Sequence, residues 1–154
     1  MLKYVNYDIV FQEIPNETTL AINISNCPNK CKGCHSPFLK EDIGRELTKD
    51  FLLNLLIKYE KSITCICFMG GDSSPKEIEY FANYVQTLSK FKIKTGWYSG
   101  KEKLPKDLSI ENFHYIKLGE YKEKYGSLKF KTTNQRLYKI NNNKLEDITH
   151  MFWR

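Results

Sequence analysis

Residues 63–98 read ITCICFMGGDSSPKEIEYFANYVQTLSKFKIKTGWY, and a strand, a helix and a second strand follow one another in this run. Residues 63–69 are mostly apolar, with β-branched and aromatic side chains, which is typical of a strand covered on both faces. Two glycines stop that strand, and the spacing of Ser74 and Glu77 then predicts a capping box at the start of a helix. Residues 92–98 predict the next strand.

The segments on either side continue this alternation. Residues 19–26 alternate in the manner of a strand, and Thr48 can cap a helix whose apolar residues share one face. Residues 113–118 predict a further strand after a weaker crossover at 105–112. This order indicates an α/β fold with a mainly parallel sheet and right-handed crossovers.

Length and composition limit the architecture. The chain has 154 residues, so we expect a single domain, 1–154, with a less regular C-terminal segment at 119–154. In that segment residues 136–140 and 144–148 flank three asparagines, which favours a hairpin. A complete eight-stranded barrel takes about 200 residues or more, so we expect an open or partial sheet.

Charge and hydropathy favour a cytoplasmic protein. The sequence has 24 basic and 18 acidic residues, and the net charge of +6 favours acidic partners only weakly. No apolar run approaches the roughly 18 residues of a membrane span, and the N-terminal stretch lacks a signal-peptide core. We therefore expect no membrane partner.

Three cysteines, Cys27, Cys31 and Cys34, lie within eight residues in the spacing C-x3-C-x2-C. The five cysteines of the chain cannot all pair, and this crowding indicates metal or redox chemistry. A closed zinc or iron-sulfur site takes four ligands, whereas this loop supplies three thiolates. If they hold three irons of a 4Fe-4S cluster, the fourth iron is open to another molecule.

A second interpretation of the same loop is a structural zinc module of the Cys3His type. It needs His35 as the fourth ligand, directly after Cys34, although zinc motifs usually keep spacers between ligands. Such a module would be non-enzymatic and would bind nucleic acid through the positive charge. Cys65 and Cys67, which face the same way on a predicted strand, are expected to be core thiols.

Gly70, Gly71 and Asp72 follow a predicted strand, and ligands gather at the carboxyl ends of strands in parallel α/β sheets. Glycines let backbone carbonyls come close to a ligand, and Asp72 can add a charge-assisted hydrogen bond. The alternative is a turn that leads into the capped helix. Trp97 and Tyr98 either line this site or pack in the core, which is the commoner place for such a pair.

The run CPNKCKGCHSP at 27–37 resembles the radical S-adenosylmethionine superfamily, and within it the activating enzymes of glycyl-radical enzymes. The pattern as a whole is most similar to the activating proteins of anaerobic ribonucleoside-triphosphate reductases. Further matches cover nearly the whole chain. They are FMGGD at 68–72, KTGWYSG at 94–100, YIKLG at 115–119, TTNQR at 132–136 and ITHMFWR at 148–154.

This resemblance implies a partial, open (βα) barrel of the radical S-adenosylmethionine type. It implies one 4Fe-4S cluster on the three cysteines, whose free iron chelates the amino and carboxylate groups of S-adenosylmethionine. An electron then cleaves the sulfonium bond and gives a 5'-deoxyadenosyl radical. The implied cofactor contacts are Gly33, Cys34 and His35 at the adenine end and Gly70, Gly71 and Asp72 at the methionyl end. No catalytic residue is implied beyond the cluster and the cofactor.

The resemblance also implies a protein substrate. The radical would abstract an α-hydrogen from a glycine of an anaerobic ribonucleoside-triphosphate reductase, and a small electron-donor protein such as flavodoxin would reduce the cluster. A partial barrel leaves one side open for a protein loop, whereas a small substrate usually needs an enclosing pocket. The alternative within enzymes is a small radical enzyme that acts on a metabolite, such as a deazapurine precursor.

Overall fold

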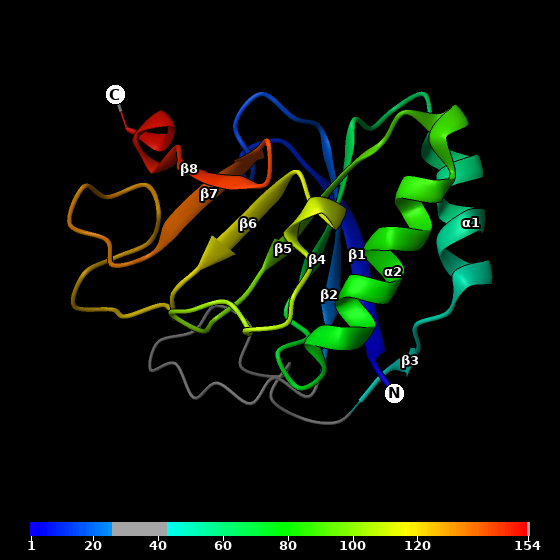
Figure 1. The fold of residues 1–154 in the computed structure, drawn as a ribbon, viewed down its shortest axis with the longest axis horizontal. Coiled ribbons are helices and arrows are strands. Elements are labelled where there is room, and N and C mark those ends of the chain that lie inside the picture. Colours follow the sequence, from blue (N-terminus) through cyan, green and yellow to red (C-terminus); the bar gives the residue numbers. More distant parts are fainter. Residues whose placement is uncertain (26–42, 154) are drawn as a thin grey trace.

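The computed structural model describes residues 1–25 and 43–153 and has an α/β fold (Figure 1). The strands are β1 (Lys3–Val10), β2 (Thr19–Ile24), β3 (Arg45–Glu46), β4 (Cys65–Met69), β5 (Lys94–Tyr98), β6 (Tyr115–Leu118), β7 (Arg136–Asn141) and β8 (Lys144–Asp147). The helices are α1 (Lys49–Tyr59) and α2 (Pro75–Thr87), with short 3-10 turns η2 (Ser89–Phe91), η3 (Ile110–Asn112) and η4 (Thr149–Phe152).

All eight strands belong to one sheet, in the order β3-β1-β2-β4-β5-β6-β7-β8. The four central strands, β2, β4, β5 and β6, are parallel to one another. On each side the sheet continues with two antiparallel strands. The α/β class is thus confirmed, but the sheet is mixed rather than mainly parallel and does not close into a barrel. Antiparallel neighbours need only short turns, whereas each parallel connection needs a crossover of about a dozen residues.

Both helices pack on one face of the sheet, as Figure 1 shows. Helix α1 begins as predicted, because the Thr48 side chain accepts a hydrogen bond from the Phe51 amide at 3.1 Å. The helices bury leucines from α1 and larger apolar side chains from α2 against β2, β4 and β5. These helix residues are Leu52, Leu55, Leu56, Ile78, Phe81, Ala82 and Val85.

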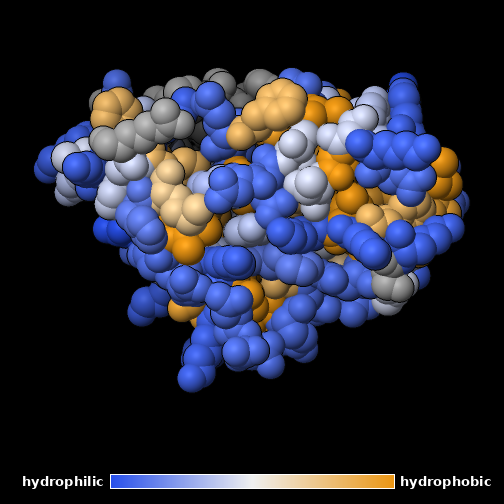
Figure 2. Space-filling model, turned by 90° about the horizontal axis from the view of Figure 1, so that it is seen from above, coloured by the Kyte–Doolittle hydropathy of each residue, from blue (hydrophilic) through white to orange (hydrophobic). Residues whose placement is uncertain are grey.

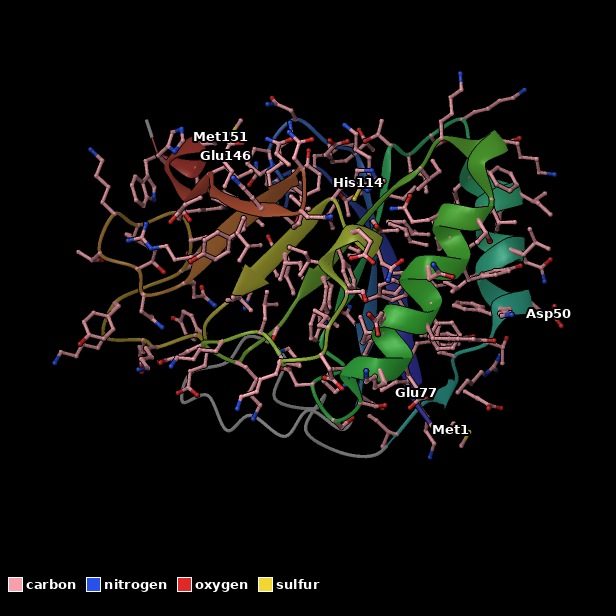
Figure 3. The ribbon with its side chains drawn as sticks, in the orientation of Figure 1. Met1, Asp50, Glu77, His114, Glu146 and Met151 are labelled. Carbon is pink, nitrogen blue, oxygen red and sulfur yellow. The ribbon has the colours of Figure 1, made fainter. Side chains whose placement is uncertain are left out.

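The start of α2 differs from the predicted capping box. The Ser74 side chain makes no hydrogen bond to the helix backbone. Instead the Glu77 carboxylate accepts the Leu2 amide at 3.1 Å and lies 3.2 Å from the Met1 ammonium group. Met1 and Glu77 lie side by side in Figure 3. Glu77 therefore joins the first turn of α2 to the start of β1.

The opposite face of the sheet carries a smaller apolar cluster: Ile14, Cys65, Cys67, Tyr115, Leu137 and Ile148. Cys65 and Cys67 are completely buried, as expected of core thiols. Burial raises the pKa of both thiols, so they stay neutral and pack as apolar groups.

The edges of the sheet were only partly predicted. The C-terminal hairpin is confirmed, with Asn142 and Asn143 at positive φ of 50° and 60° between β7 and β8. Strand β1 was not predicted. Its amide at Ile9 donates to the Asp8 side chain at 2.9 Å. The crossover at 105–112 contains only η3.

Within residues 1–25 and 43–153, no helix is long and apolar enough to cross a bilayer. Hydrophilic residues cover most of the face seen in Figure 2, and its hydrophobic residues form separate groups.

A buried carboxylate joins the amino ends of the parallel strands. The Glu17 side chain, 4% exposed, accepts hydrogen bonds from Lys94 Nζ at 2.8 Å and Thr64 Oγ1 at 2.7 Å. The Tyr115 hydroxyl donates to it at 2.6 Å. Burial alone would raise the pKa of Glu17, but these hydrogen bonds outweigh burial and hold the pKa below its ordinary value.

We expect Glu17→Gln to lower the free energy of unfolding at pH 7 by about 1–3 kcal/mol, since buried donors lose a charged acceptor. The folded pKa of Glu17 lies below its ordinary value of 4.5. The ionised Glu17 carboxylate therefore makes its full contribution to the free energy of unfolding above that ordinary pKa, and the contribution is lost as the pH falls through the folded pKa. Urea unfolding from pH 7 to pH 3 checks this, with the exposed Glu60→Gln as control. A difference that persists at low pH would contradict it.

Candidate functional site

The predicted metal ligands Cys27, Cys31 and Cys34, and with them Gly33 and His35, lie outside the residues that the structure describes. The described part of the chain holds no group of three or more His, Cys, Asp or Glu side chains that could bind a metal ion.

Ser25 and Ile43, the described residues on either side of 26–42, lie together at the carboxyl end of β2. The Ser25 amide donates to the Lys3 carbonyl at 3.0 Å, and the Ser25 hydroxyl donates to the Ile43 carbonyl at 2.5 Å. Gly70 lies close by, because a Cβ placed on it would come within 3.1 Å of the Ile24 carbonyl oxygen. The residues that flank the cysteine-bearing part of the sequence therefore lie beside the first glycine after β4.

Gly70 and Gly71 form a turn that only glycines fit. Their φ angles are +107° and +90°, a region that L side chains rarely adopt. A Cβ on Gly71 would also lie 2.5 Å from Ile78 Cδ1 of α2. The Gly71 carbonyl accepts the Ser74 amide at 3.0 Å, so the turn leads directly into α2. The turn that the sequence allowed as an alternative is present, and its backbone is free of side chains.

Trp97 stabilises this turn through a hydrogen bond from its side chain. Its ring is buried, 1% exposed, and stacks on Phe113 with 5.9 Å between ring centroids. Its Nε1 donates to the Gly70 carbonyl at 2.7 Å, while the Gly70 amide donates to the Tyr98 carbonyl at 3.0 Å. Trp97 is thus a core residue that also fixes the orientation of the Gly70 peptide group.

Asp72 joins the carboxyl ends of β4 and β5. The residue is buried, and Oδ1 accepts the Ser99 hydroxyl at 2.5 Å while Oδ2 accepts the Gly100 amide at 2.8 Å. Sequence analysis missed Ser99, although its place in the run KTGWYSG, directly after a predicted strand, was a usable signal.

The same hydrogen-bonded edge continues to β6 and β7. The Lys101 amide donates to Ser99 Oγ at 3.1 Å, and the Gly119 amide donates to the Lys101 carbonyl at 2.7 Å. The Gly119 carbonyl accepts Lys117 Nζ at 2.9 Å and Gln135 Nε2 at 3.3 Å. The motif segments at 68–72, 94–100, 115–119 and 132–136 therefore meet at one edge.

Lys117 and Tyr98 lie on the sheet face opposite the helices. Lys117 is 7% exposed, and its ammonium lies 5.3 Å from the centre of the Tyr98 ring. The Tyr98 hydroxyl donates to the Glu13 carbonyl, so Tyr98 lines this face while Trp97 fills the core. The Lys117 ammonium is thus a buried positive charge held by the Gly119 carbonyl beside the Tyr98 ring.

Comparisons with known proteins add no assigned role to these residues. No family model matches the chain, no curated protein matches it, and no solved structure matches it. The interpretation of the site therefore depends on its own geometry and on the motif resemblance.

We expect Trp97→Phe to loosen the glycine turn, because the ring is kept but the buried Gly70 carbonyl loses its indole donor. The free energy of unfolding should fall by about 1–3 kcal/mol, and backbone amides of residues 70–72 should exchange hydrogen faster. Phe113→Leu is the control, because it alters the packing on the Trp97 ring but keeps the indole donor. In this variant the amides of residues 70–72 should exchange hydrogen more slowly than in Trp97→Phe. Equal exchange in the two variants would refute the role of the indole donor.

Proposed function

We propose that the chain is a radical S-adenosylmethionine enzyme that generates the glycyl radical of an anaerobic ribonucleoside-triphosphate reductase. One observation carries this proposal. Ser25 and Ile43, which flank the part of the sequence with Cys27, Cys31 and Cys34, lie beside Gly70 at the carboxyl ends of the parallel strands. Ligands of parallel α/β sheets bind at that edge.

The described residues fit the methionyl end of S-adenosylmethionine. The carbonyls of Gly70 and Gly71 each accept one hydrogen bond, from Trp97 and Ser74, and each keeps a second acceptor position. The space at the two Cα atoms is filled by Ile24 and Ile78, so the remaining acceptor positions of the Gly70 and Gly71 carbonyls are the groups that would receive a cationic amino group. The Asp72 carboxylate adds an electrostatic attraction for the same group.

The chain's own residues hold these groups in place before a ligand binds. Ser99 and Gly100 fix both oxygens of Asp72, and Trp97 fixes the Gly70 peptide group. Groups that are already oriented need little reorganisation on binding. When bound to the three cysteines, a 4Fe-4S cluster with S-adenosylmethionine on its free iron supplies the adenosyl radical that takes the glycine α-hydrogen. The required electron comes from an external donor such as flavodoxin.

The architecture supports a protein substrate over a metabolite. Four parallel strands at the centre of an open sheet are compatible with a partial, open (βα) barrel of the radical S-adenosylmethionine type, and antiparallel strands extend the sheet on both sides. An open sheet, unlike a closed barrel, does not enclose a substrate on all sides, which suits a loop of another protein. A small metabolite would need a more enclosed pocket.

We expect the anaerobically reconstituted and reduced chain to cleave S-adenosylmethionine to methionine and 5'-deoxyadenosine, and Cys31→Ala to abolish this. Cys67→Ala is the matched control, because that thiol is neutral and buried in the core. It should keep both iron and cleavage. Cleavage by Cys31→Ala would contradict the proposal. Zinc in place of iron would also contradict it and would favour the Cys3His zinc module.

We expect Asp72→Asn to weaken the binding of S-adenosylmethionine about tenfold or more, since a charge-assisted hydrogen bond contributes about 1.5–3 kcal/mol. The iron content should not change. Asp107→Asn, at a surface ion pair with Lys76, is the control and should bind like the unmodified chain. Titration of each reconstituted protein with the cofactor measures the affinity, and equal values for both variants would count against the assigned role of Asp72.

A further inference from the structure

After Gly119 the chain forms a loop of residues 120–131, the 120–131 loop. Side chains from other segments hold this loop in one conformation. Each of these side chains donates to a backbone carbonyl of the loop. The donors and acceptors are Thr132 Oγ1 to Tyr125 at 2.7 Å, Thr133 Oγ1 to Gly126 at 3.2 Å, Asn134 Nδ2 to Glu120 at 3.0 Å and Trp153 Nε1 to Leu128 at 2.9 Å. The TTNQR motif and Trp153 therefore both stabilise the 120–131 loop.

The loop nevertheless presents large apolar side chains to solvent. Tyr125 is 38% exposed and Phe130 is 59% exposed, whereas Leu128 is buried as an anchor. The Phe130 ring lies against the backbone at Gly126, where a Cβ would come within 2.9 Å of the ring. Its direction is therefore fixed although most of the ring is open to solvent. Oriented aromatic side chains of this kind are enriched at protein interfaces.

The charge of the loop is positive but mixed. Its sequence EYKEKYGSLKFK contains four lysines and two glutamates, a net charge of +2. The Lys124 ammonium lies 5.5 Å from the centre of the Tyr125 ring, and Lys122 Nζ lies 3.6 Å from Glu102. Interspersed glutamates do not suit a phosphate backbone, whereas they are compatible with a peptide that carries its own pattern of charges.

The loop is continuous with the candidate site. It begins directly after Gly119, whose amide binds the Lys101 carbonyl, and Lys101 in turn binds Ser99, the partner of Asp72. The start of the loop is therefore joined, through Gly119, Lys101 and Ser99, to the edge that carries Asp72.

We propose that the 120–131 loop docks the protein substrate by binding an acidic segment next to the target glycine. Phe130 and Tyr125 pack against apolar side chains of that segment, and the lysines attract its carboxylates. The inference depends on the proposed function and adds the recognition surface to it. Because these side-chain donors already hold the loop backbone, little conformational entropy is lost when the segment binds.

The first test measures glycyl-radical formation on the anaerobic reductase of the same organism, by electron spin resonance over a series of reductase concentrations. We expect Phe130→Ala, and Lys124→Glu combined with Lys131→Glu, to raise the half-maximal concentration about tenfold, a loss of about 1.4 kcal/mol. Cleavage of S-adenosylmethionine without the reductase should not change. Ile57→Ala and Lys58→Glu on α1, at the opposite end of the molecule in Figure 1, are the controls.

The second test is independent of radical chemistry. Labelled 20-residue peptides with a central glycine, flanked either by Asp and Glu or by Lys, and a 20-nucleotide single strand are titrated with the full chain. We expect the acidic peptide to bind more tightly than the other two probes. Added salt should weaken its binding, and the loop variants should bind it about tenfold less tightly than the unmodified chain. Equal binding of the basic peptide, tighter binding of the nucleotide strand, or equal binding by the loop variants would overturn the inference.

The two proposals fail in different ways. A chain that cleaves no S-adenosylmethionine overturns the proposed function, while the peptide titration still decides what the loop binds. A chain that does cleave it, with loop variants that activate the reductase as well as the controls do, overturns the docking surface alone.

Discussion

The burial of β4 between β2 and β5 is the constraint on which the other features depend. Ile66 and Phe68 face the helices, Cys65 and Cys67 face the second apolar cluster, and all four are completely buried. A strand enclosed on both faces can carry polar chemistry only at its ends. The Glu17 cluster accordingly lies at the amino ends of the parallel strands, and the glycine turn and Asp72 lie at the carboxyl ends.

The central strand, helix and strand could be predicted from sequence because each has a strong local signal. Thr48 caps α1, Gly70 and Gly71 end β4, and the asparagines between β7 and β8 adopt the expected positive φ angles. The edges could not be predicted so well. Strand β1 has mixed polarity because it lies near the rim of the sheet, and Glu77 binds the chain terminus instead of a local cap.

In the candidate site, too, features set by neighbouring residues could be predicted, whereas features set by residues distant in the sequence could not. The rule for parallel sheets predicted that Asp72 would lie at a ligand-binding edge, but not that Ser99 and Gly100 would hold its oxygens. The task of TTNQR could not be deduced, because its side chains bind carbonyls of the preceding loop and of Gly119. Such contacts depend on how β6 and β7 pair and leave no periodic pattern.

An open sheet of eight strands exposes two rims to other molecules, and such rims are the usual starting points of amyloid-like assembly. Here one rim is β3, which has only two residues, Arg45 and Glu46, and the other rim, β8, is short and carries Lys144, Glu146 and Asp147. Neither rim is a good template for a further strand. The sheet can therefore stay open without offering a long apolar edge to a second copy of the chain.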